Sequence, residues 1–191
     1  MSPLAPMPGA ARQKEPPLAF FIHPYAVRVD AVRGALGSGS APLLRRIDGL
    51  GLDPARHLRL TQLIQGDAPH GDGDAVALEQ LVRAVGGEFL DNSQWAPFRS
   101  VWLQDVDAAL EAAGVKARVS SLVFGAPPSP LPGMADIIVS TTEHDDVARV
   151  LARFEGWERV KAPERDAVAQ VRGWLTRAQA AGRGLITFHI W

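Results

Sequence analysis

Two short apolar runs near the ends of the chain set the strongest constraint on its fold. Residues 18–27 (LAFFIHPYAV) and 185–191 (LITFHIW) are rich in aromatic and β-branched side chains and too short for stable helices, so each predicts a β-strand. Between them, apolar side chains recur at helical spacing in segments that end at glycine. Strands at both ends with helices between them predict a single α+β domain, whose small sheet includes the N- and C-terminal strands and packs with several helices.

The same spacing places the remaining elements. Asp53 and Pro54 are typical of the N-cap and the first position of a helix, and Thr142 with Asp145 resembles a capping box. We expect helices at 30–36, 42–50, 54–64, 74–85, 101–113, 147–154 and 163–182, and a third strand at 136–140.

A proline-rich segment precedes the first strand. Residues 1–17 contain five prolines and little that could pack, which predicts a flexible leader ahead of a single domain at 18–191. The leader lacks the apolar core of a secretory signal, so we expect a cytoplasmic protein.

Composition excludes several classes of function. The chain carries 20 basic and 21 acidic side chains, which argues against general nucleic-acid binding. It has no cysteine, so disulfides, thiolate metal sites and cysteine nucleophiles are excluded, and no apolar run is long enough to predict a membrane span. Phosphate-loop, dinucleotide-binding and zinc-protease motifs are absent, and we expect no cofactor and no metal.

Three segments carry a family resemblance. Residues 90–98 (LDNSQWAPF), 102–115 (WLQDVDAALEAAGV) and 171–191 resemble a bacterial family of unknown function that is distantly similar to the YfbM-like domains. The resemblance implies a small α+β domain and transfers no catalytic residue.

The first candidate site lies between two predicted helices, where polar groups and tryptophans gather. Exposed loops on a rigid scaffold often carry binding residues, and tryptophan and arginine are frequent interface anchors. In the alternative, the segment is a buried connector whose polar groups hydrogen-bond the turn while its tryptophans fill the core. The candidate binding residues are Asp91, Asn92, Trp95, Arg99 and Trp102.

The second candidate site combines the two terminal strands. If these strands pair, His23, Tyr25 and His189 could share one face of the sheet and line a pocket for acid–base chemistry or a ligand. No carboxylate accompanies them at ligand spacing, so a metal site is not predicted. In the alternative, each is an ordinary half-buried sheet residue.

A third group is basic. Arg45, Arg46, Arg56 and Arg59 fall on neighbouring predicted helices and could form a local anion-binding patch, although compositional bias toward arginine is the simpler explanation.

Together these features predict a protein-binding or regulatory domain without a catalytic motif, of the kind found in immunity proteins and antitoxins, with a protein partner. The alternative is an enzyme or small-ligand binder with a pocket near the terminal strands, and a third possibility is a self-assembling protein.

Overall fold

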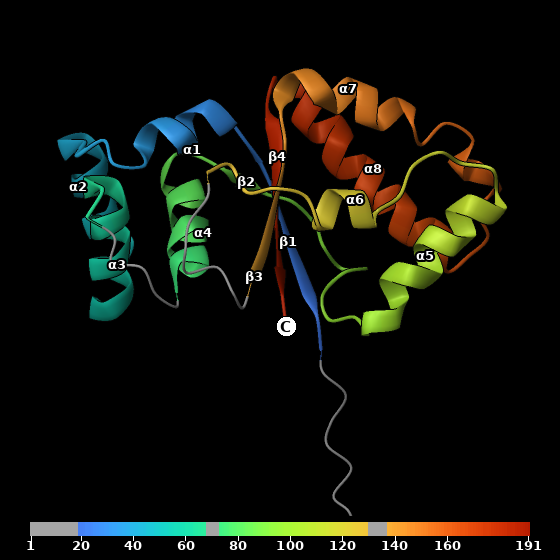
Figure 1. The fold of residues 1–191 in the computed structure, drawn as a ribbon, viewed down its shortest axis with the longest axis horizontal. Helices are drawn as coiled ribbons and strands as arrows, with labels where there is room; N and C mark the ends of the chain where they lie inside the picture. Colours follow the sequence, from blue (N-terminus) through green and yellow to red (C-terminus); the bar gives the residue numbers. More distant parts are fainter. Residues whose placement is uncertain (1–18, 68–72, 130–136) are drawn as a thin grey trace, which may run out of the picture.

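The predicted sheet forms, with one strand more than the sequence indicated. The computed structural model describes residues 19–67, 73–129 and 137–191 (Figure 1), so the predicted leader at 1–17 and its boundary at 18 lie outside the described residues. The strands follow the order β2-β1-β4-β3, and each neighbouring pair is antiparallel. They are β1 (Phe21–Val27), β2 (Glu88–Phe89), β3 (Ile137–Thr142) and β4 (Gly184–Ile190).

Helices cover both faces of this sheet. The helices between β1 and β2 pack on one face and the later ones on the other, which gives three layers with the sheet seen edge-on in Figure 1. The first layer holds α1 (Val29–Ala35), α2 (Ala41–Asp48), α3 (Pro54–Gln65) and α4 (Asp74–Ala84). The second holds α5 (Ser100–Ala112), α6 (Ser120–Val123), α7 (His144–Ala152) and α8 (Glu164–Ala180), with a short 3₁₀ turn at Trp157–Arg159. This arrangement confirms the single-domain α+β fold.

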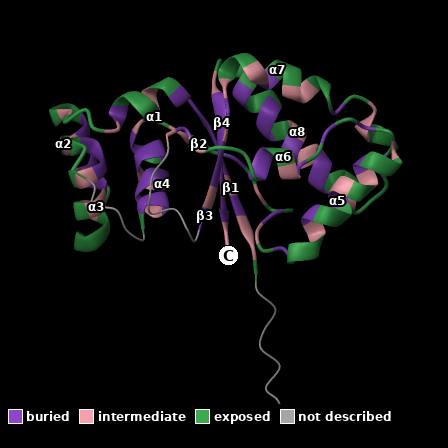
Figure 2. Ribbon diagram, in the orientation of Figure 1, coloured by how far each residue is buried: buried purple, intermediate pink, exposed green. Residues whose placement is uncertain are grey.

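The strand register explains why the sheet needs both layers. Directly opposed residues of an antiparallel pair place their side chains on the same face. Ile22 and Leu185 belong to the core under α5–α8, whereas Tyr25, Ile186 and Phe188 belong to the core under α1–α4. A strand buried on both faces reads as a nearly continuous apolar run, as β4 does. Figure 2 shows the resulting buried band through the centre of the molecule.

Proline in β1 is tolerated because of where its nitrogen points. The carbonyl of Pro24 accepts a 2.9 Å hydrogen bond from the amide of Leu90, on the β2 side. Nitrogen and carbonyl of one residue point to the same side of an antiparallel strand, so the missing N–H faces β2. The long β1–β4 ladder therefore loses no donor at this position.

Of the two helix starts predicted from capping residues, the structure confirms one and contradicts the other. Asp53 is the N-cap of α3, its Oδ1 accepts from the amide of Arg56 at 3.0 Å, and Pro54 is the first helical residue. The capping box predicted at Thr142 is wrong, because Thr142 is the last residue of β3 and Glu143 is the N-cap of α7.

Candidate functional site

A buried carboxylate joins α4 to β1. Glu79 Oε1 accepts hydrogen bonds from the Tyr25 hydroxyl at 2.7 Å and from Arg83 Nη2 at 3.1 Å, and it lies 2.9 Å from His23 Nδ1. Arg83 Nε donates to the Tyr25 oxygen at 2.7 Å, which closes the network. The alternation of β1 points His23 and Tyr25 toward the first helical layer, and Glu79 and Arg83 are one turn apart on α4.

The electrostatics of this network keep Glu79 ionised. Burial by itself would raise the pKa of Glu79, but hydrogen bonds from His23 and Tyr25, together with the charges of His23 and Arg83, lower it below its ordinary value. Burial and the adjacent carboxylate raise the pKa of Tyr25, so the phenol stays neutral. Tyr25 is fully buried and Glu79 nearly so, which leaves His23 and Arg83 as the members that reach solvent.

His189 does not join this cluster. It pairs with Ile22, whereas His23 pairs with Phe188, so the two imidazoles point to opposite faces of the sheet. The expectation that His23, Tyr25 and His189 share one face is therefore wrong, because the register offsets the two histidines by one residue and side chains alternate along a strand.

The His189 ring instead lies among aromatic side chains. It stacks on Phe20 and Phe98 and meets Phe124 and Trp191 edge-on, with centroid distances of 5.4–5.9 Å. Neither ring nitrogen has a hydrogen-bond partner in the part of the chain that the structure describes. Burial lowers the pKa of His189, which makes it a neutral core residue.

The segment at 90–102 serves as a connector clamped to the core. Asn92 Nδ2 donates to the carbonyl of Ile22 at 2.8 Å, and the fully buried Trp95 packs beneath α8 with Nε1 3.4 Å from the carbonyl of Ala167. Gln170 Nε2 donates to Asp91 Oδ2 at 2.6 Å. These contacts match the buried-connector interpretation of Asp91, Asn92 and Trp95.

The other two residues of that candidate differ in exposure. Trp102 is half-buried, with its ring centroid 6.5 Å from that of Trp95. The side chain of Arg99 is exposed and makes no hydrogen bond or ion pair with a described residue. The five candidates therefore do not form one exposed surface, although Asp91 and Arg99 each reach solvent.

Sequence analysis missed a basic groove along α7. Two adjoining hollows, of about 280 and 590 Å³, share Lys116, Arg149 and Arg153 and form one groove between α7 and the loop after α5. Arg118 and Arg159 extend it at either end, and its acidic members are Asp146 and Glu155. The cations come from three separated stretches of sequence, so the only local signal was the four-residue spacing of Arg149 and Arg153 on one helix face. We refer to this surface as the α7 groove.

The arginines that the sequence did single out are mostly engaged. Arg46 donates to the carbonyl of Ala84 at 2.8 Å, Arg56 lies 3.2 Å from Asp53, and Arg59 lies 2.5 Å from Asp74. These contacts stabilise the first helical layer. Of the four arginines, Arg56 and Arg59 line a common hollow, and Arg45 and Arg46 do not line it.

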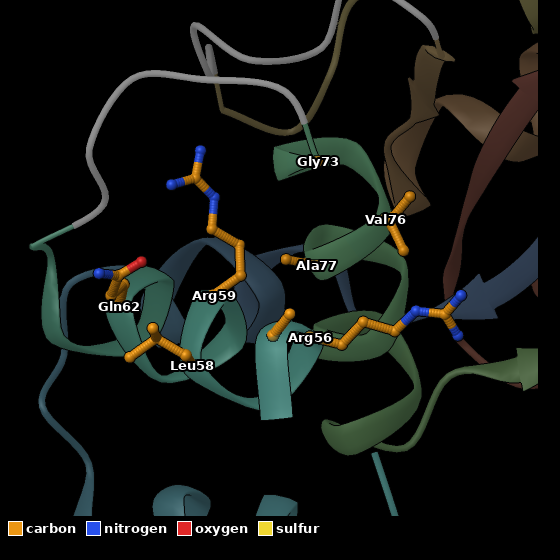
Figure 3. A pocket seen from close by; sticks show the side chains of 8 residues that line it. Arg56, Leu58, Arg59, Gln62, Gly73, Val76 and Ala77 are labelled. Atoms are coloured by element: carbon orange, nitrogen blue, oxygen red, sulfur yellow. The ribbon is translucent and has the colours of Figure 1, made fainter. Parts of the chain in front are cut away.

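A separate hollow of about 560 Å³ lies between α3 and α4 (Figure 3). Figure 3 shows Leu58 and Arg59 from α3 and Val76 and Ala77 from α4 along it. Among the described residues, no group of histidine and carboxylate side chains could hold a metal ion, and no helix is both long and apolar enough to cross a bilayer.

Comparison with known proteins identifies a family of unknown function. No curated protein and no solved structure matches the chain. A family model described as a domain of unknown function, DUF7691, matches residues 19–190, nearly the whole described chain. The likeness to YfbM-like domains and the bacterial origin stay predictions from the sequence. On this match, the chain belongs to the DUF7691 family.

Proposed function

We propose that the chain is a cytoplasmic, non-catalytic protein-binding domain that contacts a protein partner through the α7 groove. Its role would be regulatory, in the manner of immunity proteins and antitoxins, which act by occupying a surface of their partner. One observation carries the proposal: five cationic side chains surround one groove that holds two acidic ones.

Several of these cations lack a neutralising acidic side chain, which supports binding. Arg149 pairs with Asp146 at 2.6 Å and Arg118 with Glu111 at 3.3 Å. Lys116, Arg153 and Arg159 have no acidic partner among the described residues, and Arg159 Nε donates to the carbonyl of Gly156 at 3.2 Å. All five side chains are exposed. Exposed cations gathered in a concavity attract an oppositely charged surface and accelerate its association.

The buried network supports a structural role for its members. Glu79, Tyr25 and Arg83 satisfy one another, and two of the three are buried, so a substrate has little access to them. A satisfied buried network of this kind holds an element in place, here α4 against β1.

One observation favours the alternative function, a small-ligand or acid–base site. Glu79 contacts Nδ1 of His23, and Nε2 of this partly exposed ring makes no hydrogen bond to another described residue. Loss of a measured activity in His23→Gln, with the fold intact, would support this second candidate.

Native mass spectrometry on protein gently purified from its own host tests the proposal. We expect a second polypeptide bound to the wild-type chain and absent from the Lys116→Glu/Arg153→Glu variant, which breaks no ion pair between described residues. The matched control is Arg45→Glu/Lys161→Glu, which reverses the charge of one exposed arginine and one exposed lysine outside the groove and also breaks no ion pair between described residues. A complex that survives the groove variant, or a wild-type chain recovered alone, contradicts the proposal.

A further inference from the structure

We infer that the α7 groove binds an extended acidic segment of the partner protein, one that carries an apolar side chain among its carboxylates. The inference rests on the proposed function and specifies the chemistry that the groove recognises.

The shape of the groove indicates an extended ligand. Its two hollows continue into each other through Lys116, Arg149 and Arg153, and they run from Arg118 at one end to Arg159 at the other. The sides belong to ordered elements, α7 on one side and α6 with the preceding loop on the other. A peptide lying along α7 can therefore meet several cations in succession.

The charges on the groove are arranged for separate carboxylates. Four of the five cations are arginines, whose planar guanidinium groups bind carboxylates through two parallel hydrogen bonds. Lys116 and Arg153, which have no acidic partner among the described residues, lie in the part common to both hollows. Two of the three cations without an acidic partner are therefore central, and the third, Arg159, lies at one end.

The two acids in the groove argue for a peptide over a nucleic acid. Asp146 and Glu155 lie among the cations. A nucleic-acid strand carries a negative charge at every phosphate, so some phosphates would lie near these carboxylates. An acidic peptide places charge only at chosen side chains, and its backbone N–H groups can donate to Asp146 and Glu155.

The smaller of the two hollows also has apolar residues in its lining. Of the apolar residues that line it together with the cations, Val150 is half-buried, and Ala117, Leu122 and Phe154 are buried beneath it. An apolar side chain between two acidic residues of the ligand would pack on Val150 while its neighbours reach the arginines. The cations and the apolar residues of the groove together indicate a ligand segment that contains both acidic and apolar side chains.

Fluorescence anisotropy with defined probes tests this inference. The probe is a fluorescein-labelled peptide of repeating Glu-Glu-Leu, about 12 residues long, which spans roughly 40 Å when extended. We expect saturable binding that weakens as salt is raised, and about tenfold weaker binding to the Lys116→Glu/Arg153→Glu variant. The Arg45→Glu/Lys161→Glu control should bind like the wild type.

Three outcomes of these affinity comparisons would overturn it. They are unchanged affinity in the groove variant, equal binding of a peptide with glutamine in place of glutamate, and tighter binding of a single-stranded oligonucleotide of about 12 nucleotides. Absence of peptide binding up to about 1 mM also rejects it, because that affinity is too weak for a specific partner.

The outcomes separate this inference from the proposed function. If the native complex is lost in the groove variant but the acidic peptide does not bind, the protein-binding function stands and the ligand chemistry is wrong. If the peptide binds at the groove but no protein partner is found in the host, the chemistry stands and the proposed function fails.

Discussion

Tyr25 on β1 and Glu79 on α4 are joined by a 2.7 Å hydrogen bond between two buried side chains that are 54 residues apart in sequence. Arg83 donates to the same phenolic oxygen, so the hydroxyl of Tyr25 is both donor and acceptor. The bond links the first helical layer to the central sheet, and the stability of that layer should depend on it.

Removing the hydroxyl should destabilise the fold. Tyr25→Phe leaves the Glu79 carboxylate with one donor fewer in a buried position, and we expect a loss of about 1–3 kcal/mol in the free energy of unfolding. Urea denaturation measures it as a lower midpoint with an unchanged slope. Leu58→Ala, at an exposed position of α3, is the control and should stay within about 0.5 kcal/mol of the wild type. A similar result for both variants would mean that the hydroxyl is dispensable.

Glu79 should make stability depend on acid pH. Its pKa in the fold is below its ordinary value of 4.5, so the stabilisation is fully present above that value and is lost as the pH falls through the folded pKa. Glu79→Gln should be less stable than the wild type at neutral pH, with a shallower loss of stability below about pH 4.5. Denaturant midpoints between pH 7 and 3 measure the two slopes, and parallel slopes would contradict the assignment.

His189 should make the stability of the fold depend on pH at higher pH values than Glu79 does. Burial lowers its pKa from the ordinary 6.5, so the unfolded chain takes up a proton first as the pH falls, and stability decreases below about pH 6.5 until the folded pKa is reached. His189→Phe removes the titrating group and should flatten the stability profile between about pH 7 and 5.

The exposed Leu58 provides the control for this change. Leu58→Ala removes no titratable group, and it should leave the slope between pH 7 and 5 unchanged. If His189→Phe keeps the wild-type slope, His189 does not titrate as its surroundings indicate.

Substitutions in the connector at 90–102 should differ in their effect on stability, according to whether the side chain is buried or exposed. Trp95→Ala removes a fully buried ring from the core under α5–α8, and we expect a loss of about 3–5 kcal/mol in the free energy of unfolding. Arg99→Ala changes an exposed side chain and should alter stability by less than about 0.5 kcal/mol. Thermal unfolding followed by circular dichroism measures both, and a large effect of Arg99→Ala would show a contact that the structure lacks.

Much of the fold follows from local pattern. The apolar runs at 18–27 and 185–191 form β1 and β4, and glycine-terminated apolar stripes form helices within a few residues of the expected bounds. These elements depend on side-chain periodicity and caps, which act over one or two turns and are therefore visible in sequence. The two-residue β2 and the four-residue α6 were not predicted, because such short segments show no period.

The sites depend on contacts between distant segments. His23 and His189 both lie on predicted strands, yet register alone determines that they face opposite layers, and a shift of one residue would have reversed the outcome. The α7 groove likewise draws Lys116 and Arg153 from segments separated by β3. Helix and strand periods are written in neighbouring residues, whereas register and the packing of layers are set by the total burial of the folded chain, which no local stretch of sequence contains.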